Sequence, residues 1–219
     1  QMLIRAADEL DVAVSEQQAG VFGSYAEELL LWNRKMNLTA ITEPQQTAVK
    51  HFVDSLAGLS VIGRETKLVD IGTGAGFPGL PLKIVRPDLE MTLVDSVRKK
   101  ISFVNHVIRR LALSGVRAVH ARVEALAGEK AYAGAFEAVV CRAMTDMGQI
   151  IRLAMPLLAC PGRIIAYKGP KESLDDQTIA SAVNREQKET GIERAVRISR
   201  HTYRLPVYAE SRTLVVVDL

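Results

Sequence analysis

A glycine-rich turn between an apolar strand and a helix is the feature of this sequence that most restricts its fold. Residues 68–79 read LVDIGTGAGFPG, so a short apolar run enters a turn with glycines at 72, 74, 76 and 79. Glycine is needed where a bound molecule approaches the backbone, because a side chain would fill that space. The helix that follows offers unpaired N–H groups to an anionic group. The turn therefore predicts an α/β fold with a ligand at the end of the first strand.

A carboxylate follows the next apolar run. Asp95 lies 23 residues after Gly72, at the end of a predicted strand over residues 91–95. A carboxylate at that place can accept hydrogen bonds from both hydroxyls of a ribose. The glycine turn and Asp95 together predict a site for a nucleoside-containing cofactor.

Two classes of cofactor fit the glycine turn. Residues 74–79 match the GxGxxG pattern of dinucleotide enzymes, which makes a nucleotide-binding oxidoreductase one interpretation. In those enzymes the first glycine closely follows the strand, and here that glycine is Gly72, which leaves Phe77 where the third glycine belongs. Asp70 favours S-adenosylmethionine, because a carboxylate there can face a methionine ammonium but repels a pyrophosphate. We therefore expect S-adenosylmethionine, with S-adenosylhomocysteine as product; a turn without any ligand is the third interpretation.

The rest of the chain predicts a helical segment followed by alternating strands and helices. Residues 1–60 are predicted to be a helical extension, and residues 61–219 the catalytic domain. Beyond Gly63, short β-branched runs alternate with amphipathic runs, which is typical of a parallel sheet. Pro161-Gly162 is expected to separate a helix from the fifth strand. The predicted strands are 67–71, 91–95, 116–121, 136–141 and 163–167, followed by an antiparallel hairpin of 194–205 and 212–219.

Composition indicates an ordinary globular protein. Of the 219 residues 48% are apolar, and no apolar run approaches the ~20 residues that a membrane-spanning helix needs. Two cysteines, Cys141 and Cys160, occur without neighbours at ligand spacing, so we expect neither a disulfide framework nor a metal site. This cysteine usage favours a reducing cytoplasm. A monomer is the default expectation.

Motifs along nearly the whole chain resemble those of the bacterial 16S ribosomal RNA guanine-N7 methyltransferase family, once named glucose-inhibited division protein B. These motifs are LWN at 31–33, NLT at 37–39, HFVDSL at 51–56, the turn at 70–79, IVRP at 84–87, LVDS at 93–96, RVE at 122–124, CRA at 141–143 and KG at 168–169. The family usually has SRA in place of CRA. It often has RHL where this chain has RTL at 212–214, which leaves open any role of that histidine.

The resemblance implies a class I methyltransferase, which has a Rossmann-like, mostly parallel seven-stranded sheet. The implied acceptor is N7 of guanine 527 in the 530 loop of 16S rRNA, presented as rRNA or in a 30S subunit. Another RNA or a small-molecule substrate is the alternative. The implied cofactor residues are Gly72, Gly74, Gly76 and Phe77 at the methionine end, Asp95 and Ser96 at the ribose, Val123 and Glu124 at the adenine, and Arg142 by the reacting groups.

Methyl transfer to this acceptor atom depends on positioning and not on proton removal. Guanine N7 carries a lone pair and no proton, so direct displacement needs no general base. Arg142 is expected to bind guanine O6, a phosphate or the cofactor, because a bidentate contact would occupy N7. Lys168 is expected to orient the flipped nucleotide or its phosphate. His51 and Asp54 lie three residues apart and could share one helix face by the cofactor, or form a capping or packing pair.

Cys141 is a candidate nucleophile. Cys141 could attack a base as a thiolate, but it lacks the preceding proline of such enzymes, and a buried structural cysteine is the other interpretation.

Basic residues are expected to contact phosphates, with solvated surfaces as the alternative. They gather in two stretches: Arg98, Lys99, Lys100, Arg109, Arg110, Arg117 and Arg122, and Arg194, Arg197, Arg200 and Arg204.

Overall fold

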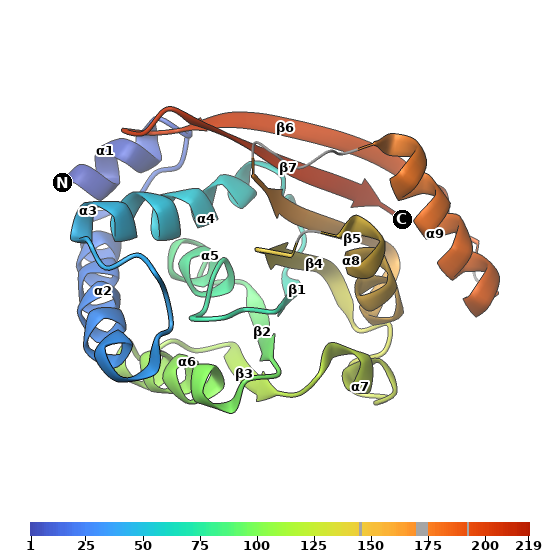
Figure 1. Cartoon of the computed structure of the whole chain (residues 1–219), viewed down its shortest axis with the longest axis horizontal. Helices are drawn as coiled ribbons and strands as arrows, with labels where there is room; N and C mark the ends of the chain where they lie inside the picture. The colour runs from blue at the N-terminus through green and yellow to red at the C-terminus, as the bar shows by residue number, and fades with distance from the viewer. Residues whose placement is uncertain (145, 170–174, 192) are drawn as a thin grey trace.

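The computed structural model describes residues 1–144, 146–169, 175–191 and 193–219, and within these ranges the strands form one sheet (Figure 1). The sheet order is β3-β2-β1-β4-β5-β7-β6. The first five strands run parallel, and β7 is antiparallel to both β5 and β6. The strands are β1 (Lys67–Ile71), β2 (Glu90–Asp95), β3 (Val116–His120), β4 (Phe136–Arg142), β5 (Leu158–Lys168), β6 (Arg197–Leu205) and β7 (Glu210–Asp218). The predicted parallel sheet with a C-terminal antiparallel hairpin is confirmed.

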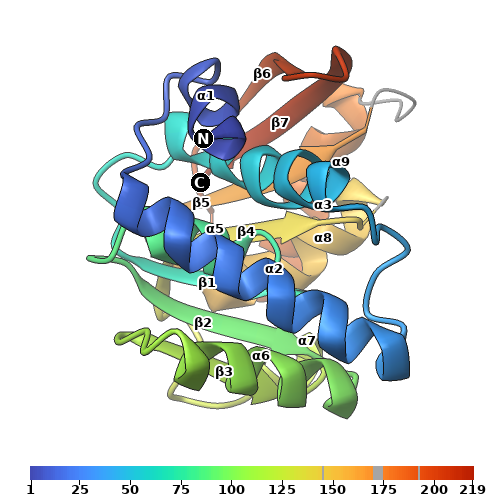
Figure 2. The same cartoon turned by 90° about the vertical axis from the view of Figure 1, so that its left-hand side faces the viewer.

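Helices cover both faces of the sheet (Figure 2). One face carries α1 (Met2–Asp8), α2 (Glu16–Met36), α3 (Pro44–Gln46), the π-helix η1 (Thr47–Val53), α4 (Asp54–Leu56), the 3-10 turn η2 (Ala57–Ser60), α5 (Gly79–Val85) and α6 (Arg98–Arg110). The other carries α7 (Val123–Ala127), α8 (Met147–Ala154), η3 (Met155–Leu157) and α9 (Asp176–Thr190). Across the described ranges, no helix has the length and apolar character that crossing a membrane requires.

The alternation of side chains along each strand separates the two cores. Leu68 of β1 belongs to the cluster under the N-terminal helices, whereas Val69 belongs to the cluster under α8 and α9. Successive side chains of a strand point to opposite faces, so both faces of this parallel sheet need apolar residues. The long apolar runs of the central strands follow from this double burial.

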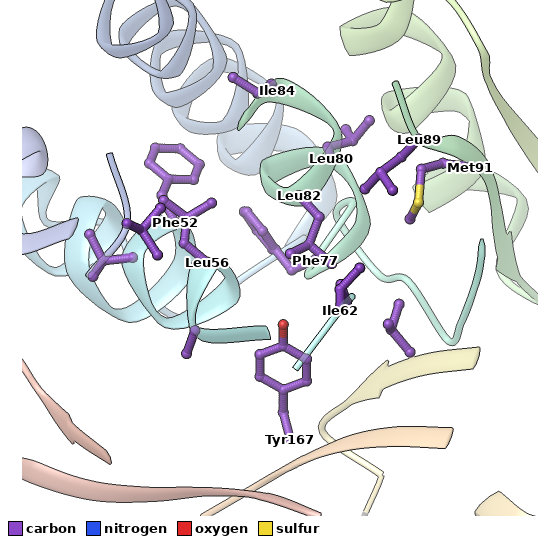
Figure 3. Packing of buried hydrophobic residues seen from close by; sticks show 14 of the residues in the cluster. Phe52, Leu56, Ile62, Phe77, Leu80, Leu82, Ile84, Leu89, Met91 and Tyr167 are labelled. Atoms are coloured by element: carbon purple, nitrogen blue, oxygen red, sulfur yellow. The ribbon is translucent and has the colours of Figure 1, made fainter. Parts of the chain in front are cut away.

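The N-terminal helices share the core of the sheet. Phe22 of α2 lies 5.1 Å from Phe52 of η1 between ring centroids. Figure 3 shows Phe52 and Phe77 above Tyr167 of β5, whose hydroxyl points toward the helices and donates to the backbone oxygen of Ser55 at 2.6 Å. Residues on both sides of the predicted domain boundary near residue 60 belong to one hydrophobic cluster. This shared core does not test the boundary, which stays a prediction.

Local capping interactions set both ends of α2, and hydrogen bonds of Asn33 hold the segment that follows. Ser15 and Gln18 form a capping box that satisfies N–H groups at the start of the helix. Asn37 ends the helix in the left-handed conformation with φ 49°. The Asn33 side chain then bonds both the backbone N–H and the backbone oxygen of Thr39, each at 2.9 Å. The segment after α2 is thereby folded back onto its own helix.

The predicted start of the fifth strand is wrong. Pro161-Gly162 lies inside β5, which begins at Leu158. Leu158 already pairs with Phe136 of β4, and the register shifts before the next pair. The intervening residues of β5 include exposed ones and have no pairing partner in β4, so they form a bulge near the amino end of β5, where a proline costs no ladder hydrogen bond to β4.

Close packing between α5 and the sheet predicts a stability effect at Gly79. A Cβ at Gly79 would collide with Leu93 Cδ2 and lie 2.8 Å from Asp70 Oδ2. We expect Gly79→Ala to lower the free energy of unfolding by about 2 kcal/mol in urea denaturation, because backbone and core must shift. Gly20→Ala in α2 is the matched control, since a Cβ there meets nothing within 4 Å. The control should be neutral or stabilise by up to about 1 kcal/mol; equal stability of the two variants would contradict this packing.

Candidate functional site

A cavity of about 620 Å³ opens at the carboxyl ends of the parallel strands. In open α/β sheets, ligands bind at this edge, beside the point where the strand order changes direction. Here that point lies between β1 and β4. The loops after β1, β2, β3 and β4 and the segment after α2 all contribute to its wall. Eight of the predicted site residues line it: Gly72, Gly74, Phe77, Asp95, Ser96, Val123, Glu124 and Arg142.

Asp70 lies behind the cavity wall and holds the glycine turn from inside. Its side chain is fully buried. Its Oδ2 atom accepts from the Thr73 hydroxyl at 2.6 Å and from the backbone N–H of Gly79 at 2.9 Å. Its Oδ1 atom has no hydrogen-bond partner among the described residues. Burial raises the pKa of the Asp70 carboxyl to about 7, against the opposing effect of these hydrogen bonds.

Asp95 fixes the turn from the cavity side. Its Oδ2 atom accepts from the backbone N–H of Gly74 at 3.0 Å, and its Oδ1 atom accepts from the N–H of Val97 at 2.8 Å. Lys100 Nζ lies 3.5 Å from the same carboxylate. A carboxylate oxygen has more than one lone pair, so Asp95 keeps capacity for hydroxyl donors from a ligand.

The backbone of the turn leaves room for a molecule. Gly72 and Gly74 have φ of 70° and 60°, a region that glycine adopts without strain. A Cβ added to Gly72 would meet nothing closer than Met144 Sδ at 3.8 Å, and one at Gly74 nothing closer than 4.0 Å. Because both residues line the cavity, side chains there would take up cavity space. This space fits the predicted S-adenosylmethionine, and the assignment of its methionine end to these glycines stays a prediction.

Tyr25 of α2 supports the turn from below. Its hydroxyl donates to the backbone oxygen of Ala75. Its ring stacks on Phe77 with centroids 5.5 Å apart. A Cβ at Gly76 would lie 2.5 Å from the Tyr25 hydroxyl, so Gly76 is needed for packing behind the cavity. No site role was predicted for Tyr25 from the sequence; the available signal was its hydroxyl, which needs an acceptor when the ring is buried in a helical core.

A stack of three groups forms one side of the cavity. His51 lies on Phe77 with centroids 4.5 Å apart and an interplanar angle of 11°. Arg142, at the end of β4, places its guanidinium carbon 5.0 Å from the centroid of the same ring. The face of an aromatic ring attracts a cation, so Phe77 helps to hold the guanidinium beside the cavity.

Arg142 is also bonded to the helical segment above the sheet. Its Nη1 atom donates to the backbone oxygens of Lys50 and His51, at 3.2 and 3.3 Å, and to Asp54 Oδ2 at 3.2 Å. Both carbonyls belong to the π-helix η1, a wide turn that is frequent at functional sites. His51 lines the cavity and Asp54 does not, but both contact Arg142. A role of either residue beside the cofactor stays a prediction.

His51 is held neutral. Burial, with Arg142 nearby, lowers the pKa of His51 to about 3. The neutral ring can accept the Arg142 Nη2 contact at its Nδ1, 3.4 Å away, while its Nε2–H donates to the Thr39 hydroxyl at 2.8 Å. The NLT motif therefore has a function that its sequence did not reveal: Thr39 orients the imidazole.

The remaining predicted residues lie in the interior. Lys168 is 2% exposed, and its Nζ donates to the backbone oxygen of Met144 at 2.6 Å. Met144 itself lines the cavity, so Lys168 reaches the wall rather than the open space. Cys141 is 1% exposed in the core under α8, which supports the structural interpretation over the nucleophile. In the described part of the chain, no cluster of three or more His, Cys, Asp or Glu side chains could hold a metal ion.

The buried Asp70 predicts a pH dependence of stability. A pKa of about 7 in the folded state, raised from 3.8, means that the folded protein binds more protons than the unfolded chain between these values. Stability should therefore fall as pH rises from about 5 to about 7, by about 2 kcal/mol. Asp70→Asn, which keeps the shape without the charge, should remove this slope in urea unfolding at the two pH values. An unchanged slope would contradict the burial of an ionisable carboxyl here.

The chain is similar to known proteins of one family. The family model described as rRNA small subunit methyltransferase G matches residues 18–202. Ribosomal RNA small subunit methyltransferase G of Geotalea uraniireducens (strain Rf4) is 42% identical over 217 residues, covering 99% of this chain and 95% of that protein. The protein of the same name from Geobacter sp. (strain M21) is 48% identical over 169 residues, covering 77% of each chain.

A solved structure gives the fold independently. The O-methyltransferase from Bacillus cereus in complex with SAH has a TM-score of 0.59 at 16% identity, and the match covers 90% of this chain and 91% of that chain. This likeness confirms the predicted class I methyltransferase fold. The roles of the individual site residues stay predictions. The family model over residues 18–202 and the relatives that are 42% and 48% identical establish that this chain belongs to the rRNA small subunit methyltransferase G family.

Proposed function

We propose that this protein transfers the methyl group of S-adenosylmethionine to N7 of guanine 527 in the 530 loop of 16S rRNA. The observation that carries the proposal is the cavity in which the glycine turn, Asp95 and Arg142 meet, in a chain of this family. Relatives named ribosomal RNA small subunit methyltransferase G support the substrate class and argue against an oxidoreductase. A cytoplasmic location and a monomeric state belong to the same proposal.

The cavity residues divide between the parts of the methyl donor. S-adenosylmethionine, when bound, supplies a methyl group on a positively charged sulfur. The Asp95 carboxylate is suited to accept from ribose hydroxyls, because it lines the cavity and its two oxygens keep lone pairs beyond those used by the N–H groups of Gly74 and Val97. The backbone of Gly72 and Gly74 lines the space for the methionine end, and Val123 and Glu124 line the space after β3 for the adenine.

The acceptor side of the cavity is suited to positioning without proton transfer. Guanine N7 needs no base, and His51 is a poor one because its pKa is about 3. Arg142 keeps a positive charge at the wall, with a side chain 15% exposed, where it can bind guanine O6 or a phosphate. Catalysis then depends on holding N7 in line with the methyl group.

Basic residues at the cavity suit a polyanionic substrate. Lys100 and Arg122 line the cavity, and Arg98 and Lys99 are exposed in the first turn of α6 beside them. Lys99 Nζ donates to the backbone oxygen of Met36 at 2.9 Å, which fixes it between α6 and the end of α2. Positive charge gathered at one edge attracts phosphates and lowers the cost of bringing RNA to the site.

The proposal is tested by methyl transfer to 30S subunits that lack the modification. With S-adenosylmethionine labelled in the methyl group, label should appear at N7 of guanine 527 after nuclease digestion and mass spectrometry. Asp95→Asn should lower transfer about tenfold or more at limiting cofactor, because a charged acceptor is lost. Label at another nucleotide would retain the enzyme class and reject the nucleotide. Cofactor binding without label in any rRNA would reject the rRNA substrate.

Charge reversal at the mouth tests the RNA surface. Each of Arg98→Glu and Lys99→Glu should weaken binding of a 530-loop RNA about tenfold near 150 mM salt and lower the salt slope by about one, if each contacts a phosphate. Lys188→Glu, at an exposed residue of α9 on the other face of the sheet, is the matched control. Equal affinity of all three variants and the wild type in a fluorescence titration would remove phosphate contacts from the first turn of α6.

A further inference from the structure

A buried carboxylate joins the arginine of the cavity to the C-terminal hairpin. Asp54 begins α4, and its side chain is 8% exposed. Its Oδ2 atom accepts from Arg142 Nη1 at 3.2 Å. Its other oxygen, Oδ1, accepts from the Tyr203 hydroxyl at 2.8 Å and lies 3.6 Å from Arg212 Nε. One side chain therefore contacts the cavity arginine with one oxygen and two residues of β6 and β7 with the other.

The contacts continue into a ring. Its side chains alternate in charge from Arg142 through Asp54, Arg212 and Glu210 to Lys50, and a neutral backbone carbonyl closes it. Arg212 Nη2 lies 2.5 Å from Glu210 Oε2, and Glu210 Oε1 lies 2.7 Å from Lys50 Nζ. The backbone oxygen of Lys50 accepts from Arg142, which closes the ring. Figure 1 shows the turn between β6 and β7 close to the helices at the N-terminal end, so segments far apart in sequence meet here.

The ring limits where the Arg142 guanidinium can lie. A planar guanidinium is fixed by two or more directional acceptors, whereas a single contact leaves it free to rotate. Asp54 supplies the charged acceptor, and the carbonyls of the π-helix supply the neutral ones. Tyr203 and Arg212 in turn hold the Asp54 carboxylate, whose burial makes an unpaired orientation costly.

We infer that Asp54 is a positioning residue for methyl transfer, and that the β6–β7 hairpin, through Tyr203 and Arg212, sets its orientation and thereby that of Arg142. The inference rests on the proposed function in one respect, that Arg142 touches the target nucleotide. It gives the C-terminal hairpin a part in the active site, although its residues do not appear among those lining the cavity within the described ranges.

A double-mutant cycle on turnover tests the inference. Asp54→Asn should lower kcat for 30S methylation on the order of tenfold, with KM for S-adenosylmethionine nearly unchanged, because orientation is lost and not cofactor contact. Arg142→Gln should lower kcat about a hundredfold or more. The double variant should match Arg142→Gln within about twofold, because Asp54 acts only through Arg142. Effects that multiply independently would overturn the inference.

Controls separate positioning from general stability. Asp88→Asn breaks another Asp–Arg pair, with Arg86 at 2.6 Å, near the amino end of β2, and should leave kcat unchanged. Tyr203→Phe removes one bond to Asp54 and should lower kcat by a smaller factor, and this effect should also vanish when Arg142 is replaced. A loss of kcat in Tyr203→Phe that persists in the Arg142→Gln background would count against the hairpin's role.

A second readout does not need activity. The same Asp54 and Arg142 variants give a stability cycle in urea, in which the double variant should be destabilised less than the two single effects together predict. Additive stabilities would overturn the inferred contact whatever the substrate is. Wild-type protein that methylates no rRNA would reject the proposed function, while the stability cycle would still decide whether Asp54 and Arg142 act together.

Discussion

The buried carboxylate of Asp70 holds the glycine turn of the site at both ends. Asp70 Oδ2 accepts from Thr73 near the start of the turn and from Gly79 at its end, so one atom fixes the loop that carries Gly72 and Gly74. The position of α5 and the cradle at the sheet edge both depend on it. Burying this carboxylate is costly, which its raised pKa of about 7 expresses. Stability is thus given up for a fixed loop, as is common at functional sites.

The helices before the sheet complete the site. Tyr25 supports the turn from α2, while His51 and Asp54 reach Phe77 and Arg142 from η1 and α4. The cavity wall is therefore shared between the carboxyl edge of the sheet and the helical segment that precedes the first strand. Such a wall is rigid because each group has partners on more than one element.

The strands and the cofactor edge could be predicted from sequence because they rest on local signals. Periodic apolar runs gave the strands, and glycine spacing with Asp95 gave the cavity edge. The start of β5 was predicted wrongly, since a proline in a bulge resembles a strand boundary in the sequence. The links of Tyr25 to Ala75 and of Asp54 to Tyr203 join residues 50 and 149 positions apart, and no local pattern encodes such pairs.

The proposed function depends most directly on where the methyl donor binds, and a crystal structure of the protein with S-adenosylhomocysteine measures this. We expect electron density in the cavity at the carboxyl edge, with the ribose hydroxyls bonded to Asp95 and the amino-acid end against the backbone of Gly72 and Gly74. Density in the groove at the opposite edge of the sheet, lined by Arg163 and Asp218, or a ligand that leaves Asp95 without contact, would contradict it.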